Sequence, residues 1–307
     1  MSGLTLGTAQ LGIPYGAVNR TGKPSRAVAV AMVRHAIAHG VSALDTARAY
    51  GDSEEVVGEA LSAYSVPRPQ VITKLDPLTS LSPSAGPAEV RSAVEQSVRQ
   101  SCEALRTDRL ETLLLHRWQH YRGWQGEAWN RLLEFHQQGK VAALGASVYK
   151  PEEAVEALRE PMVRHLQIPL NLLDWRWRAP EVGSALAARP EIVVHARSAL
   201  LQGILIHPAA HWPAVEGFDA AGCVLRLKSV ASGFKRESIS DLCFAYVRSQ
   251  AWVHSVVVGC ETMEQLEENL RLFQLPKLNA AQCQEVEQEL PRPPEALLNP
   301  ACWNSGG

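Results

Sequence analysis

The chain of 307 residues lacks long apolar runs, paired cysteines and an excess of one charge. No apolar stretch approaches the roughly 20 residues that a membrane-spanning helix needs. The 30 basic and 32 acidic residues are interspersed and give a formal net charge of −2. We therefore expect no membrane and no nucleic-acid partner, because such runs and charge excesses are what those partners require.

The cysteines follow no pattern that indicates a disulfide or a metal site. None of the six stands in a Cys-x-x-Cys motif or near a run of histidines, which favours reduced thiols. The N-terminal residues also lack the charged and apolar regions of a signal peptide, so we expect a cytoplasmic protein. The cysteines are Cys102, Cys223, Cys243, Cys260, Cys283 and Cys302.

Two nucleotide-binding fingerprints are also missing. No Gly-x-Gly-x-x-Gly follows an apolar run, which argues against a doubly wound dinucleotide-binding sheet. Gly7 and Gly12 have the glycine spacing of a phosphate-binding P-loop. However, Ile13 and Pro14 stand where that loop needs a lysine and a hydroxyl residue. The P-loop interpretation therefore fails.

The sequence does contain an alternation of short apolar runs and amphipathic stretches. Continuous apolar runs are typical of strands buried on both faces, and intervening helices force parallel pairing. Eight such pairs predict a (β/α)8 TIM barrel, a single domain over residues 1–307, with a doubly wound sheet as the alternative. The predicted strands are Leu4–Gly7, Ala43–Asp45, Gln70–Lys74, Leu110–His116, Val141–Ser147, His165–Ile168, Ile192–His195 and Ser255–Gly259. The predicted helices are Arg26–His39, Glu54–Ser62, Glu89–Leu105, Glu127–Gln138, Glu152–Arg159, Ala179–Ala188, Ile239–Gln250 and Thr262–Leu270.

Three segments depart from this rhythm. Residues 206–237, after the seventh strand, are longer than an ordinary barrel connection, and we expect them to form a functional loop. Residues 76–88 are rich in turn-forming residues and follow the third strand. Both segments would lie on the face where the strands end. The proline-rich residues from about 291 onward are expected to be a C-terminal extension rather than a further domain.

Four chemically active side chains stand at or just after strand ends: Asp45, Tyr50, Lys74 and His116. In a barrel of parallel strands these ends converge at one mouth, where such barrels place their active sites. Each residue alone has an ordinary structural explanation, such as a helix cap, although lysine is rarely buried unpaired. Their joint occurrence favours a functional site.

A phenol, an ammonium, a carboxylate and an imidazole together form a proton-donating site. The pKa of a free tyrosine is near 10, and we expect the Lys74 ammonium to lower that of Tyr50. Asp45 would neutralise the desolvated Lys74, and His116 would donate to a carbonyl oxygen. These groups include no nucleophile with its base, so a hydride from a nicotinamide is the natural reactant.

These residues resemble the catalytic motifs of the aldo-keto reductase superfamily. The matching segments are Asp45-Thr-Ala-x-x-Tyr50-Gly51, Ile-Thr-Lys74 and Leu-Leu-Leu-His116, and later segments extend the resemblance over nearly the whole chain. The resemblance implies a (β/α)8 barrel that binds NADP(H) or NAD(H) across its C-terminal face, without a metal. Tyr50 would be the general acid in carbonyl reduction.

The resemblance also implies which residues hold the cofactor. Ser147 and Gln167 would fix the nicotinamide carboxamide. The loop after strand seven would surround the pyrophosphate, and the segment after strand eight would reach the adenosine. The expected cofactor-binding residues are Gly7, Thr8, Ser147, Gln167, Arg197, Ser198, Leu200, Gly203, Gly259, Glu261, Gln265, Glu268 and Asn269.

Two departures from the family pattern bear on the cofactor. Arg197 stands where the family often has an aromatic residue under the nicotinamide; a guanidinium can stack, but it adds charge beside a ring that is cationic when oxidised. Family members that prefer NADP(H) usually clamp the 2′-phosphate with basic or hydroxyl residues. This chain has Glu261 and Gln265 in that stretch. Glu261 would repel a phosphate and could accept hydrogen bonds from a ribose diol, which favours tolerance of NAD(H).

The expected substrate is a small aldehyde, ketone or free aldose, or the alcohol in the reverse reaction, because no arginine cluster marks a sugar phosphate. Tyr15, Trp118, Trp175 and Trp177 could wall an apolar pocket or simply pack at loop bases. Two other classes of function remain open. One is a cofactor-binding regulatory barrel with little turnover. The other is a metal-dependent hydrolase, which would need a His-x-His that the chain does not contain.

Overall fold

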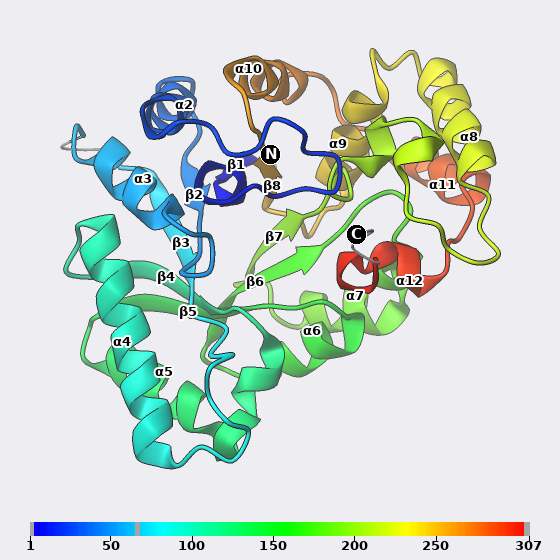
Figure 1. Cartoon of the computed structure of the whole chain (residues 1–307). Coiled ribbons are helices and arrows are strands. Elements are labelled where there is room, and N and C mark those ends of the chain that lie inside the picture. Colours follow the sequence, from blue (N-terminus) through cyan, green and yellow to red (C-terminus); the bar gives the residue numbers. More distant parts are fainter. Residues whose placement is uncertain (1–2, 65–67, 304–307) are drawn as a thin grey trace.

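Eight parallel strands close into a barrel in the computed structural model, with helices around the outside (Figure 1). The structure describes residues 3–64 and 68–303. Each strand pairs with the next in chain order, and β8 closes onto β1, so the predicted (β/α)8 barrel is confirmed. The strands are β1 (Gly3–Gly7), β2 (Ala43–Asp45), β3 (Gln70–Lys74), β4 (Leu110–Leu115), β5 (Val141–Ser147), β6 (Val163–Pro169), β7 (Val193–Arg197) and β8 (Ser255–Gly259).

The strand bounds differ from the predicted ones mainly at β4, β6 and β7. β4 ends at Leu115, so His116 is the first residue beyond it. β6 and β7 extend further toward the C-terminal face because they stay paired there, with Pro169 opposite Arg197. Arg197 therefore belongs to the rim of the barrel wall and not to the loop that follows.

The predicted helices are all present, with ends set by local signals. The Ser25 hydroxyl accepts from the Val28 amide at the start of one helix, and Pro87 occupies the first turn of another. No helix among the described residues is long and apolar enough to cross a membrane. These helices are α2 (Arg26–Ala38), α3 (Ser53–Leu61), α4 (Pro87–Leu105), α5 (Glu127–Gln137), α6 (Pro151–Ala157), α7 (Pro180–Ala187), α9 (Ile239–Ser249) and α10 (Met263–Leu272).

The segment 206–237 is largely helical, which corrects the expectation of a long loop. Its helix is capped by Asp219, whose side chain accepts from the Gly222 amide, and it packs near α11 (Figure 1). The residues beyond 291 return to the barrel through the buried Leu297 and Leu298. The additional helices are α1 (Ala9–Gly12), α8 (Ala220–Gly233), α11 (Ala280–Glu289) and α12 (Glu295–Leu298). The 3₁₀ turns are η1 (Trp118–Tyr121), η2 (Gly123–Gly126), η3 (Trp175–Arg178), η4 (Ile204–Ile206), η5 (Ala209–His211) and η6 (Pro300–Cys302).

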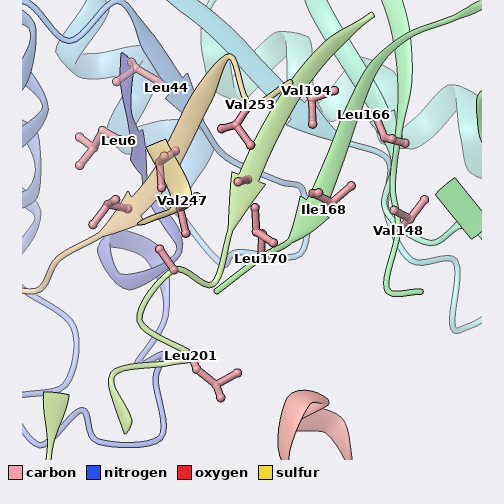
Figure 2. Close-up of a cluster of buried hydrophobic side chains, with 14 of the residues drawn as sticks. Leu6, Leu44, Val148, Leu166, Ile168, Leu170, Val194, Leu201, Val247 and Val253 are labelled. Atoms are coloured by element: carbon pink, nitrogen blue, oxygen red, sulfur yellow. The ribbon is translucent and has the colours of Figure 1, made fainter. Parts of the chain in front are cut away.

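The two faces of the barrel wall differ in chemistry. Outward residues such as Leu6, Leu44 and Leu166 belong to the main apolar core, which packs against the helices (Figure 2). Strand alternation turns the other set of residues into the barrel. There a small apolar cluster is surrounded by buried polar side chains. The cluster is Ala43, Ile72 and Leu114, and the polar residues are Thr5, Asp45, Lys74, Thr112, His165, Gln167, His195 and Ser255.

Close packing inside the barrel generates a first prediction, at Gly145. A Cβ there would lie 2.1 Å from the His165 carbonyl oxygen and 2.6 Å from a Leu114 methyl carbon. We expect Gly145→Ala to lower the free energy of unfolding by about 1–3 kcal/mol, because β5 and β6 must move apart.

Gly183→Ala in α7 is the matched control, since its Cβ would meet nothing within 4 Å. This change should raise stability by about 0.5–1 kcal/mol, as alanine does in a helix. Urea unfolding measures both variants. If the two variants had equal free energies of unfolding, the contact between β5 and β6 at Gly145 would not be tight.

Candidate active site

The four residues singled out by their positions in the sequence converge at one mouth of the barrel. Lys74 Nζ donates to Asp45 Oδ1 at 2.7 Å and to the Thr46 carbonyl at 3.0 Å. The same ammonium lies 4.9 Å from the centroid of the Tyr50 ring. The His116 and Tyr50 rings meet edge to face, with centroids 5.7 Å apart. The structure thus places a phenol, an imidazole and a buried ion pair in one group.

Two glycines fix the position of Tyr50. A Cβ on Gly12 would lie 1.8 Å from the Tyr50 carbonyl oxygen, and one on Gly51 would lie 2.4 Å from the Gly12 carbonyl oxygen. Gly51 also has a φ of +59°, which glycine adopts without strain. The short helix α1 therefore packs directly on the turn that carries Tyr50. This contact explains Gly12, whose spacing from Gly7 resembled a P-loop.

The protonation of Tyr50 differs from the expectation. Burial raises the pKa of Tyr50 well above its ordinary value, Asp45 adds to the effect, and Arg197 opposes it. Lys74 is not among the main groups that shift this pKa, although its ammonium lies near the ring. Tyr50 is therefore a protonated phenol at neutral pH.

Three histidines around the site, the half-buried His116 and the buried His165 and His195, are neutral. Burial lowers the pKa of His116 to about 3, with Lys74 as a further cause. His165 and His195 lie inside the barrel below the ion pair, with ring centroids 4.3 Å apart. Burial lowers the pKa of His165 well below its ordinary value and that of His195 to about 4. A neutral His116 can donate one N–H to a substrate oxygen, but it does not supply a second cation.

A cavity of about 340 Å³ begins at Tyr50 and Asp45 and continues along the ends of β7, β8 and β1. Most of the residues expected to bind the cofactor line it. They are Gly7, Gln167, Arg197, Ser198, Leu200, Gly203, Gly259, Glu261, Gln265, Glu268 and Asn269.

Two residues of the expected cofactor set are not among those that line the cavity. Thr8 is fully buried, and its hydroxyl donates to the Asp45 carbonyl at 2.9 Å and lies 2.6 Å from the Ser53 hydroxyl. Ser147 is 2% exposed and stands opposite Gln167 where β5 pairs with β6. Thr8 therefore ties β1 to β2 here.

The loop after β7 has an unusual backbone. Ser198, Leu201 and Gln202 have φ values of 63°, 47° and 52°, and Gly203 follows with 88°. Non-glycine residues in this region cost free energy, and such strain concentrates at ligand sites. The loop geometry suits the pyrophosphate role that the family resemblance implies.

The segment after β8 presents carboxylates and amides to the cavity. Glu261 accepts from the Thr21 hydroxyl at 3.2 Å, and its amide donates to Gln265 Oε1 at 2.7 Å. Glu268 is held by a bidentate bond from Arg271. This end of the cavity therefore carries acidic groups and no lysine or arginine among its lining residues.

In the segment between β1 and α2, the sequence pointed only to Thr8 and Tyr15 as candidate site residues. Gly16 and Val18 line the cavity, as does Tyr15. The segment lies against the β7 loop: Tyr15 Oη is 3.2 Å from Gln202 Nε2, and a Cβ on Gly203 would lie 2.4 Å from a Val18 methyl carbon. No motif marks this segment, because its role comes from tertiary packing.

The four aromatic residues proposed as walls of a substrate pocket do not all line the same cavity. Among them, Tyr15 lines the cavity that contains Tyr50. Trp118 and Trp177 are buried, with their indole N–H groups donating to Glu156 and Asp174. Trp175 donates to the Pro293 carbonyl and lines a separate cavity. These contacts favour the alternative explanation for the three tryptophans, namely that they pack at the bases of loops.

The cavity suits a nicotinamide dinucleotide. Gln167 donates to Asp45 Oδ2 at 2.6 Å, while its own Oε1 is buried and has no hydrogen-bond partner among the described residues. Such an orphaned acceptor is costly unless a ligand donates to it, as a carboxamide N–H can. Within residues 3–64 and 68–303, no group of three or more His, Cys, Asp or Glu side chains is placed to hold a metal.

The chain belongs to the aldo/keto reductase family, whose sequence model matches residues 3–290. It is 30% identical over 176 residues to the aldo-keto reductase YhdN of Bacillus subtilis. That match covers 54% of this chain and 51% of YhdN, so it spans about half the length of the relative. Membership of the family implies an oxidoreductase, and its members generally use NAD(P)H.

Solved structures share the fold. The aldo-keto reductase AKR11C1 of Bacillus halodurans, in its holo form, has a TM-score of 0.71 at 20% identity, over 94% of this chain and 92% of that one. The glycerol dehydrogenase AKR11B4 of Gluconobacter oxydans has a TM-score of 0.69 at 21% identity, over 95% and 93%. At these identities the likeness establishes the barrel and not the substrate.

The buried His195 predicts a specific loss of stability in acid. Its native pKa of about 4 lies below the ordinary value of 6.5, so the unfolded chain binds its proton first as the pH falls. The free energy of unfolding should therefore fall between pH 6.5 and 4, by roughly 3 kcal/mol from this residue at about 1.4 kcal/mol per pH unit.

Urea unfolding at several pH values across this range measures the effect. His195→Gln should make the free energy of unfolding depend less steeply on pH. Substitution of the exposed His39 by glutamine should leave this pH dependence unchanged. The same slope in both variants would mean that His195 is not held neutral in the native state.

Proposed function

We propose that the chain reduces a small aldehyde, ketone or aldose by hydride transfer from a nicotinamide cofactor, with Tyr50 as the general acid. The observation that carries this proposal is the phenol at one end of a long cavity, backed by a buried ammonium–carboxylate pair. Such a site can protonate an oxygen, but the four groups supply no attacking atom. The bound nicotinamide would supply the hydride.

Each residue of the group has a distinct task in this proposal. His116 donates its N–H to the carbonyl oxygen and orients it toward Tyr50. As the hydride arrives, the oxygen becomes an alkoxide, which is a much stronger base than a phenolate and takes the Tyr50 proton. The nearby Lys74 ammonium then stabilises the phenolate left behind. Asp45 keeps Lys74 in place and charged.

Gln167 connects this group to the cofactor. Its Nε2 is bonded to Asp45, which fixes the orientation of the amide and leaves Oε1 without a hydrogen-bond partner among the described residues. A nicotinamide carboxamide would donate to that oxygen, with Ser147 as the neighbouring partner. The ion pair would thereby set the positions of both the acid and the reacting ring.

The acidic end of the cavity bears on the choice of cofactor. Glu261 is exposed to the cavity and its carboxylate is not neutralised by an ion pair among the described residues. A ribose diol can donate to this carboxylate, whereas a 2′-phosphate would be repelled by it. We infer that the site accepts NAD(H) at least as readily as NADP(H).

The acid role of Tyr50 is tested by Tyr50→Phe. We expect at least a thousandfold loss of kcat with a cofactor Kd within a few-fold of the unchanged protein, because only the proton donor is removed. Tryptophan fluorescence quenching gives the Kd, and an aldehyde and aldose screen gives the turnover. Retained turnover in the variant would overturn the mechanism.

The cofactor inference is tested by Glu261→Arg. Replacing repulsion by a charge-assisted contact should shift the ratio of the Kd values for NADH and NADPH at least tenfold toward NADPH. Glu264→Arg, one turn away in α10, controls for the general effect of added positive charge. If both variants shift the ratio equally, Glu261 does not face the ribose.

A further inference from the structure

Arg197 occupies a defined position at the reactive end of the cavity. It ends β7, and its Nη2 donates to the Val148 carbonyl at 3.1 Å. The guanidinium carbon lies 4.6 Å from the centroid of the Tyr149 ring. These contacts with the residues after β5 hold the guanidinium across the end of β6, which lies between β5 and β7. Arg197 lines the same cavity as Tyr50.

The positive charge of Arg197 is not compensated locally. Among the described residues no carboxylate lies within ion-pair distance of its guanidinium. The nearest anion of the site, Asp45, is already shared between Lys74 and Gln167. Glu261 and Glu268 line the cavity on the β8 side, and Glu268 is itself paired with Arg271.

The charge of Arg197 influences the whole catalytic group. It contributes to a lower pKa of Lys74 and of His116, and it opposes the rise in the pKa of Tyr50. The Lys74–Asp45 pair is neutral as a unit, and both Tyr50 and His116 are uncharged at neutral pH. One excess positive charge therefore remains where a nicotinamide would react.

The two redox forms of a nicotinamide differ by one charge at this place. The reduced ring is neutral, while the oxidised ring carries a positive charge that the partly buried guanidinium would repel. We propose that Arg197 makes the site bind the reduced cofactor more tightly than the oxidised one. This inference rests on the proposed function and adds to it a selectivity between the two redox forms of the cofactor. A repulsion between two such charges corresponds to a factor on the order of ten or more in Kd.

The test compares the Kd of the oxidised cofactor with that of the reduced one, followed by tryptophan fluorescence. We expect the unchanged protein to bind the reduced form at least tenfold more tightly. Arg197→Gln keeps an N–H for Val148 but removes the charge, and it should lower this ratio five- to twentyfold. Arg197→Lys keeps the charge and should retain most of the ratio.

The control is Arg122→Gln, which removes an exposed charge from the connection after β4, on the same face of the barrel. It should leave the ratio unchanged. Arg197→Tyr is a second neutral variant, in case the glutamine fails to fold. An unchanged ratio in the folded neutral variants would overturn the inference, as would an equally large loss in Arg197→Lys.

The same experiment separates this inference from the proposed function. If the unchanged protein binds neither form, the proposed function fails. If it binds both forms and the ratio does not depend on the charge at position 197, only the inferred selectivity between the two redox forms fails. A selective rise in KM for carboxylate-bearing aldehydes in Arg197→Gln, without a change in the ratio, would assign Arg197 to the substrate instead and would also overturn the inference.

Discussion

The site depends on the buried ion pair between Lys74 and Asp45, whose side chains are only 1% and 5% exposed. Removing either charge from water costs several kcal/mol, which their attraction offsets only if the remaining hydrogen-bonding capacity is used. Here it is used: Lys74 also donates to the Thr46 carbonyl, and the second Asp45 oxygen accepts from Gln167. The pair is therefore fixed, and the groups around it acquire fixed positions.

The same pair joins parts of the barrel that are distant in sequence. Asp45 ends β2, Lys74 ends β3 and Gln167 comes from β6, so one set of hydrogen bonds spans the mouth. Thr8 adds β1 through its bond to the Asp45 carbonyl. Removing one partner would leave a buried charge uncompensated, which commonly costs about 3–5 kcal/mol. The contacts that fix the geometry of the candidate site therefore also join four strand ends of the barrel.

The barrel could be predicted from sequence because its strands are buried on both faces and stand out as apolar runs. The group of four was visible because each member stands at or just past a strand end. Other features depend on contacts that leave no local pattern. The segment with Tyr15 and Val18 lies over the cavity only because it packs against the β7 loop. Likewise, we expected Lys74 to lower the pKa of Tyr50, but burial of the side chain raises it. The extent of this burial depends on the folded structure.

The charge states of the site bear on the roles proposed for Tyr50 and Arg197. Raising the pKa of Tyr50 makes it a poor base for removing a proton from an alcohol at neutral pH, yet leaves it acidic enough to protonate an alkoxide. The low pKa of His116 removes a second cation that could stabilise the phenolate. Arg197 opposes the rise in the pKa of Tyr50 only in part. Burial of the phenol and the uncompensated guanidinium are independent features: in the proposed reaction the first keeps the acid protonated, and the second would disfavour binding of the oxidised cofactor.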